Sequence, residues 1–322
     1  MPWITSRKLK SSHLMAKVFF IKDLNKVAEL FDLAGIAKII NKNDSVALKI
    51  HFGEPGNTAF LKPHQVKTIA EKVINLGGKP FYTDCNTLYK GRRAETKTHL
   101  EVAKEHGYTL EEAGAQAIIP AEDDCESVEI GQKHFKRVHI GNNARKSEAI
   151  IAVTHFKGHE LTGFGGALKN LGMGFGTRIG KLKMHQDCKN CDKVKHCEKN
   201  KTIEACWVGS PAFVAEKIVE YAYGAIKDKK TAYFNFIINV SEACDCYPHN
   251  SEPIVPDIGV LASFDPVATD QASVDLVNQT EGRINSRNKF RAIYSNVDWA
   301  VQLKYAEEIG LGSRKYELIQ ID

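Results

Sequence analysis

Two groups of cysteines have the spacing of metal ligands. The first supplies four thiolates from one short stretch: Cys188, Cys191, Cys197 and Cys206. Zinc favours four tetrahedral ligands and often takes them from two CxxC pairs, whereas an iron–sulfur cluster itself spans irregular cysteine spacings. The stretch contains one CxxC pair, Cys188 and Cys191. We therefore expect an iron–sulfur cluster of the 4Fe–4S type here, with zinc as the alternative.

The second group, Cys244 and Cys246, comes directly after an apolar run, residues 231–240, that predicts a buried strand. Two thiols one residue apart on a turn can both face one metal ion. They are also compatible with free thiols in a loop, or with a site in which Cys246 takes the place of Cys206. The sequence does not decide whether Cys206 or Cys246 is the fourth ligand of the first site.

A glycine-rich stretch, GHELTGFGGALKNLGMGFGTRIG, precedes the first cysteine group and spans residues 158–180. Each glycine gives up backbone entropy on folding and offers no side chain to pack, so the stretch is typical of a flexible loop that approaches a ligand. We expect its backbone amides to bind an anion or a cofactor, at Gly163, Gly165 and Gly166.

One lysine and several histidines surround these glycines. Lys169 lies among small residues, and its long amine could reach a phosphate, a carboxylate or a carbonyl carbon. The alternative is a surface lysine at the start of a helix. Three histidines, His155, His159 and His185, lie close to Lys169 in the sequence, and His185 precedes Cys188 by only three residues. We therefore expect a reactive cleft next to the metal centre.

Short apolar runs alternate with amphipathic segments, which is typical of a β-α-β arrangement. The pattern predicts an α/β fold with mostly parallel sheets flanked by helices. We expect two intimately packed lobes, residues 15–155 and 156–322, with a cysteine-rich insert at 186–206 in the second. Residues 1–14 are expected to be a disordered extension.

Three predicted strands end in polar residues. They end at His51, at Asp84 and at the segment from His155 to His159. Ligands of open α/β sheets bind beyond the carboxyl ends of the strands, so these ends are expected to converge on one cleft. We predict His51, His159 and Lys169 as catalytic residues there.

Composition narrows the class of protein. The 322 residues include 43% hydrophobic and 26% charged ones, which is ordinary for a soluble enzyme. The sequence contains neither an apolar run long enough for a membrane span nor a signal peptide, so we expect a cytoplasmic protein with reduced cysteines. The net charge of +5 is modest, and nucleic acid is an improbable partner.

Three phrases resemble a known family. The strings HFKGHELTGFGGALKNLGMG, CDCYP and DPVATDQASVDLVN are similar to those of uncharacterised iron–sulfur-centre proteins that share a domain of unknown function. The resemblance covers about residues 15–278 and implies an iron–sulfur centre, because many of these proteins carry a ferredoxin module. This chain departs from that module, since a single CxxC pair stands in its place.

A second, more distant resemblance is to the nickel-pincer lactate racemases. His159, Lys169 and His185 follow one another as the corresponding residues of that family do. The resemblance implies that Lys169 anchors a nucleotide-derived cofactor, that His185 is a metal ligand and that His159 is an acid–base group. His51 would occupy the place of a strand-end motif, although the arginine of that motif is not evident here.

We carry three hypotheses. The first is an iron–sulfur protein that acts as a redox or Lewis-acid enzyme on a small anionic substrate, with an electron-transfer partner. The second is an isomerase or racemase-like enzyme with a metal-pincer-type cofactor tethered to Lys169. The third is a zinc-knuckle protein that binds nucleic acid through the lysines of the cysteine-rich insert.

Overall fold

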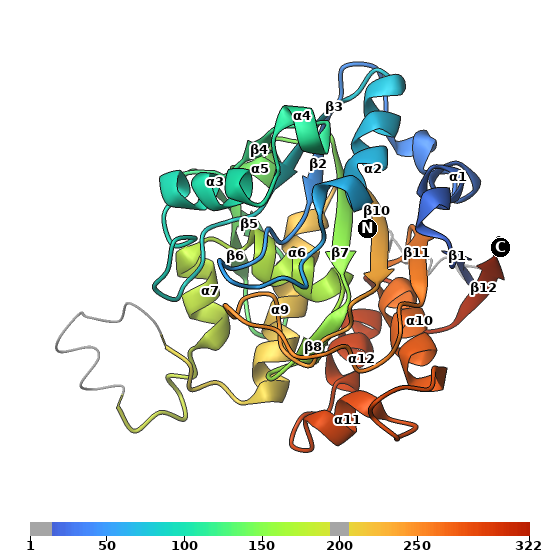
Figure 1. The fold of residues 1–322 in the computed structure, drawn as a ribbon. Coiled ribbons are helices and arrows are strands. Elements are labelled where there is room, and N and C mark those ends of the chain that lie inside the picture. Colours follow the sequence, from blue (N-terminus) through green and yellow to red (C-terminus); the bar gives the residue numbers. More distant parts are fainter. Residues whose placement is uncertain (1–14, 194–205) are drawn as a thin grey trace, which may run out of the picture.

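The protein folds around one central sheet, which helices cover on both faces (Figure 1). The computed structural model describes residues 15–193 and 206–322. In these ranges the central sheet has eight strands in the order β12-β1-β11-β10-β7-β2-β3-β4. In chain order they are β1 (Ala16–Ile21), β2 (Ser45–Lys49), β3 (Lys79–Thr83), β4 (Ala117–Ile118), β7 (Ala149–His155), β10 (Lys230–Ile237), β11 (Gly259–Ser263) and β12 (Tyr316–Gln320).

All neighbouring strands of this sheet are parallel except β11, which runs antiparallel to both β1 and β10. The α/β fold with a mostly parallel sheet and flanking helices is thus confirmed. Strands from both predicted lobes join this sheet without a break, and the division at residue 155 stays a prediction. A separate antiparallel hairpin is formed by β5 (Cys125–Glu129) and β6 (Arg137–Gly141).

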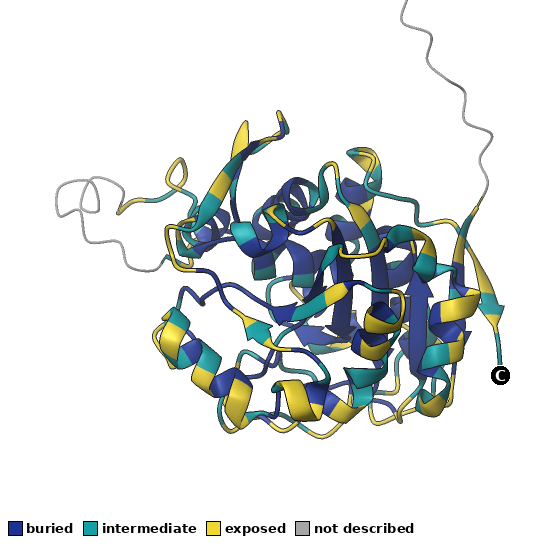
Figure 2. Cartoon of the chain, turned by 90° about the horizontal axis from the view of Figure 1, so that it is seen from above, coloured by how far each residue is buried: buried dark blue, intermediate teal, exposed yellow. Residues whose placement is uncertain are grey.

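Each face of the sheet has its own hydrophobic core, because successive side chains of a strand point to opposite faces. On β7, Ile150 and Ala152 pack on one face, while Ile151 and Val153 pack on the other. The first face is covered by α6 (Ala167–Phe175), α9 (Pro211–Ile226) and α10 (Pro266–Gln279), and the second by α1 (Val27–Leu33) and α2 (Pro63–Asn75). Figure 2 shows the central strands as buried and the outer surfaces of the helices as exposed.

The ends of several helices follow from local sequence signals. Helix α2 begins with Pro63 and is followed by Gly77 at φ 82°, and α10 begins with Pro266 after Asp265, whose side chain accepts from Val267 N and Ala268 N. The other helices of the described ranges are α3 (Thr96–Glu105), α4 (Leu110–Ala113), α5 (Asn142–Arg145), α7 (Arg178–His185), α11 (Lys289–Ile293), α12 (Ala300–Glu308) and the 3₁₀ segments Leu24–Lys26 and Ile36–Ile39. Among the described residues, no helix has the length and apolar character to cross a bilayer.

Candidate active site

The carboxyl ends of four adjacent parallel strands, β10, β7, β2 and β3, open on one cavity of about 810 Å³. His51 reaches it from the end of β2, Asp84 from β3, His159 from beyond β7 and Cys246 from beyond β10. The convergence of the strand ends expected from the sequence is therefore present. Lys169 and His185 also border this cavity, so it brings together most of the residues that the sequence singled out; their roles stay predictions.

The glycine-rich stretch is not a flexible loop, and that interpretation was wrong. It forms a short hairpin, β8 (Lys157–His159) and β9 (Gly163–Gly165), and then continues into α6 and α7. A Cβ atom on Gly158 would lie 2.1 Å from the carbonyl oxygen of Glu242, and one on Gly172 would lie 2.0 Å from that of Ile218. These glycines therefore allow close contact between segments of the chain itself.

An aspartate far away in the sequence occupies the N-terminus of α6. The carboxylate of Asp270, on α10, accepts hydrogen bonds from Ala167 N (2.6 Å) and Leu168 N (3.0 Å). A Cβ on Gly166 would lie 2.3 Å from Asp270 Oδ1, so glycine is required for this approach. Burial raises the pKa of Asp270 to about 6. The first amides of α6 are thus already bonded, although Gly165 and Gly166 still border the cavity.

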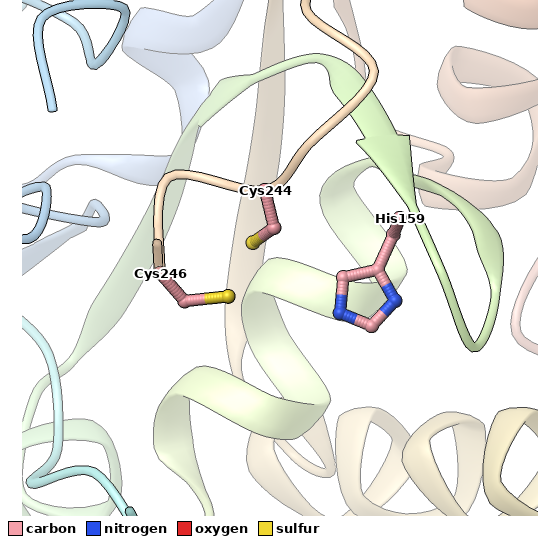
Figure 3. Close-up of side chains that lie close together, drawn as sticks. All are labelled: His159, Cys244 and Cys246. Carbon is pink, nitrogen blue, oxygen red and sulfur yellow. The ribbon is translucent and has the colours of Figure 1, made fainter. Parts of the chain in front are cut away.

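Three soft or borderline metal ligands meet beside the cavity. The sulfurs of Cys244 and Cys246 and a ring nitrogen of His159 all lie within 4.8 Å of one another. Figure 3 shows the imidazole and the two thiols turned toward one another. The His159 Nδ1 accepts a hydrogen bond from Leu161 N (3.2 Å), which leaves Nε2 to face a ligand. Two sulfurs and an imidazole are a ligand set typical of zinc and related ions.

The turn that carries the two cysteines is held by buried charges. Asp245, between them, is fully buried and contacts Lys157 Nζ (2.9 Å) and His155 Nδ1 (2.9 Å). His155 also reaches the carbonyl oxygen of Ile238 through Nε2 (2.8 Å). Burial alone would oppose ionisation of Asp245, but His155 and Lys157 lower its pKa below the usual range. His155 therefore supports the turn and does not border the cavity.

The two thiols have different proton affinities. The hydrogen bond from Cys246 lowers the pKa of Cys244 well below its usual value, and the ammonium of Lys169, 3.3 Å from Cys244 Sγ, acts in the same direction. The same hydrogen bond, together with burial, raises the pKa of Cys246. Cys244 is thus the more acidic of the two thiols, and the thiolate form is the one that binds metals.

Two other histidines border the cavity. Burial, with Arg93 nearby, lowers the pKa of His51 well below its usual value. Donors approach both of its ring nitrogens: Gly53 N at 3.1 Å from Nδ1 and Arg93 Nη1 at 3.2 Å from Nε2. Burial also lowers the pKa of His185, on α7, to about 4. In the part of the chain that the structure describes, the buried Nδ1 of His185 has no hydrogen-bond partner.

Buried cations surround the cavity, and most of them have a carboxylate partner. Lys49 lies 3.1 Å from Asp84, and Arg93 lies 2.8 Å from Glu54. Lys169 and Lys181 are the exceptions, since neither forms an ion pair with a carboxylate of the described chain. Our sequence analysis missed Lys181, although it lies one helical turn before His185 and thus on the same face of α7.

The cysteine-rich insert starts after α7 and returns to the same place. Gly209 N donates to the carbonyl oxygen of His185 (2.8 Å), which ties its two ends together. Burial lowers the pKa of Lys217, on α9, and the nearby Cys188 and Cys206 act on it in the opposite direction. Cys188 is exposed, whereas Cys191 and Cys206 are half-buried. Cys197 lies outside the described residues, so the predicted four-cysteine site stays a prediction.

Comparison with known proteins identifies the family. Residues 46–275 match the model of a domain of unknown function, DUF362. The chain belongs to the DUF362 family. The resemblance to a domain of unknown function is thereby confirmed, and the iron–sulfur centre stays a prediction for this DUF362 chain.

A solved structure that this DUF362 chain resembles is the lactate racemase apoprotein from Thermoanaerobacterium thermosaccharolyticum, with 15% sequence identity and a TM-score of 0.43. The match covers 69% of this chain and 51% of the racemase, so the chain spans about half the length of that protein. A search of curated proteins finds no match.

Proposed function

We propose that the protein is a metal-dependent enzyme that acts on a small anion, with the metal held by Cys244, Cys246 and His159. The observation that carries this proposal is the meeting of these three ligands beside a cavity rich in buried cations. Catalytic zinc sites commonly use three protein ligands and leave a fourth position open for water or substrate. A metal in that position supplies a Lewis acid for an oxygen atom of the substrate.

The residues fit a metal ion, with one condition on His159. A neutral imidazole carries one proton, so a metal on Nε2 requires the proton on Nδ1. Nδ1 now accepts the N–H of Leu161 (3.2 Å), and two N–H groups cannot share this contact. Metal binding should therefore break the Leu161 hydrogen bond. The amide of Leu161 should exchange its hydrogen faster in the metal-bound protein than in the metal-free protein.

Titration of the metal-free protein with Co²⁺ tests the proposal, because thiolate–cobalt bonds give charge-transfer absorption. We expect Cys244→Ser and Cys246→Ser each to weaken binding at this site by more than the roughly 10–100-fold that loss of an outer-shell partner costs. Cys125→Ser is the matched control, since Cys125 is also half-buried but does not border the cavity. Unchanged binding in both cavity variants, with loss in Cys188→Ser/Cys191→Ser, would place the metal in the insert alone and overturn the proposal.

We further propose that the insert carries an iron–sulfur cluster on Cys188, Cys191, Cys197 and Cys206. The choice of Cys206 over Cys246 is supported by the shared proximity of Cys188 and Cys206 to Lys217, and by the place of Cys246 beside Cys244 and His159. Protein purified without oxygen should then contain iron and acid-labile sulfide, which Cys206→Ser should reduce and Cys246→Ser should leave. Zinc without sulfide would contradict this assignment.

A second candidate function is an isomerase with a cofactor tethered to Lys169. The specific observation in its favour is that Lys169, His159 and His185 border the same cavity. A covalent bond to the amine requires its unprotonated form. Although burial opposes the charge, the Cys244 thiolate raises the pKa of Lys169 above its usual value, and a cofactor would have to displace this contact. Intact mass spectrometry of the native protein would detect the adduct, which Lys169→Ala should remove.

A further inference from the structure

The buried cations of the cavity fall into two classes. Lys49, Arg93 and Lys157 each face a carboxylate from a strand end, at distances of 3.1, 2.8 and 2.9 Å. Lys169 and Lys181, which come from the helices α6 and α7, are only 8% and 5% exposed but have no such partner in the described chain. Lys169 contacts the Cys244 sulfur (3.3 Å) and Lys181 contacts carbonyl oxygens. Because no carboxylate in the described chain pairs with either buried ammonium group, both can bind an anion.

The hydrogen bonds of these two groups leave donors unused. Lys181 Nζ donates to the carbonyl oxygens of Gly176 (2.6 Å) and, weakly, Cys85 (3.5 Å). Among the residues that the structure describes, Lys169 Nζ donates only to Cys244 Sγ. Because an ammonium group has three N–H bonds, Lys181 retains at least one donor and Lys169 retains two.

A third group, His185, connects the two lysines. It lies one helical turn after Lys181, so both side chains leave α7 on the same face and border the cavity. The positive charges of Lys169 and Lys181 both act on its ring. Its Nδ1 is buried and has no partner within the described ranges, and its ring lies 4.4 Å from that of Trp207. An imidazole N–H can donate to the same anion as the two lysines.

We propose that Lys181, Lys169 and His185 form an oxyanion subsite, which binds the carboxylate or phosphoryl group of the ligand beside the cysteine pair. This inference rests on the proposed function for the metal and deepens it, because it names the chemical class of the substrate. The anion occupies the side of the cavity formed by α6 and α7. The metal site, at the end of β10, faces the remaining atoms of the bound ligand.

The test uses the full-length, metal-free protein with inorganic phosphate and acetate as separate probes. Binding is followed by the rise in melting temperature, because a ligand that binds only the folded state stabilises it. We expect at least one probe to raise the melting temperature of the wild type. Lys181→Met should weaken that binding about tenfold or more, as expected for loss of a charged hydrogen-bond donor. Lys181→Arg should retain most of it.

The matched control is Lys289→Met. Lys289 is also buried and also donates only to carbonyl oxygens, of Asn278 (3.0 Å) and Ser286 (3.2 Å), but it does not border the cavity. This variant should bind the probe as the wild type does. A response to phosphate alone assigns a phosphoryl group, and a response to acetate alone assigns a carboxylate.

Two results would overturn the subsite. The first is a wild-type protein whose melting temperature neither probe raises. This result does not depend on whether any variant folds. The other is a Lys181→Met protein that binds as tightly as Lys289→Met. Because no metal is present, these results do not depend on the proposed metal site. Conversely, a wild-type protein that binds the anion but not Co²⁺ would contradict the metal-dependent function and still support the oxyanion subsite.

Discussion

Replacing Asp270 should loosen the helix that carries Lys169. The Asp270 carboxylate accepts from Ala167 N (2.6 Å), Leu168 N (3.0 Å) and Asn235 Nδ2 (2.8 Å). Asp270→Ala leaves these donors buried without an acceptor, and each such loss costs about 1–3 kcal/mol. We expect the free energy of unfolding to fall by at least about 3 kcal/mol, a large share of the 5–15 kcal/mol typical of a folded protein.

The same carboxylate predicts a pH dependence. Burial raises the pKa of Asp270 to about 6 from a usual value of 3.8. A raised pKa means that the folded state holds this proton more tightly than the unfolded state does. The contribution to stability is thus complete below about pH 4 and is lost as the pH rises through 6. Between pH 8 and pH 5, the wild type should gain roughly 1 kcal/mol relative to Asp270→Asn, which cannot titrate.

Urea unfolding of the wild type, Asp270→Ala and Asp270→Asn at pH 5 and pH 8 measures both effects. Asp270→Asn keeps one acceptor oxygen and should be less destabilised than Asp270→Ala. The reasoning fails if Asp270→Ala costs less than about 1 kcal/mol. It also fails if the difference between the wild type and Asp270→Asn stays constant, or shifts against the wild type, as the pH is lowered.

Two further substitutions test how the cavity walls are held. Gly172→Ala should lower the free energy of unfolding in urea by about 1–3 kcal/mol, because its Cβ would lie 2.0 Å from the carbonyl oxygen of Ile218 and push α6 away from α9. A variant as stable as the wild type would contradict this close packing. Lys49→Met should cost up to about 3–5 kcal/mol, because it leaves the buried Asp84 with the longer ion pair to Arg93 (3.9 Å) in place of the 3.1 Å contact, and Lys49→Met/Asp84→Asn should recover most of this loss. A double variant no more stable than the single one would exclude the ion pair as the cause.

The fold was predictable because its signals are local. Apolar runs such as residues 149–155 have the length of a buried strand, and the structure places them in β7. The start of α10 was equally predictable, since Asp265 and Pro266 lie next to the residues they cap. The amphipathic segment of residues 24–40 does not form one continuous helix, because Gly35, with a φ of 74°, ends the helical path. A single glycine within an amphipathic pattern is a weak signal of such a break.

The candidate site was predictable only in part. The order of strands and helices places His51, His159 and Lys169 at one edge of the sheet, which follows from the rule for parallel strands. The partner of each group could not be predicted, because it comes from a distant part of the chain. Asp270 bonds to Leu168, which is 102 residues earlier, and short-range sequence patterns carry no record of this contact.

The glycines show why a pattern can be given the wrong cause. A glycine has a cost in backbone entropy, which contact with a ligand is one way to offset. At Gly172 the space without a side chain is filled by the backbone of α9, and at Gly158 by the carbonyl oxygen of Glu242. Glycine thus serves close packing between segments of this chain. A ligand-binding loop and a packed hairpin can have the same glycine-rich pattern, so the sequence does not distinguish them.

The distribution of charge around the cavity gives a physical reason for an anionic ligand. The carboxylates that neutralise Lys49, Arg93 and Lys157 come from the ends of β3, β2 and β10. Strand ends therefore supply both the negative charges and the cysteine pair, while the helices on the other side supply Lys169 and Lys181. Since the strand-end carboxylates are already paired, the excess positive charge lies on the helix side. An anion bound there places its remaining atoms toward the strand ends, where the thiols lie, whereas a neutral or cationic ligand would leave Lys169 and Lys181 without a carboxylate or phosphate partner.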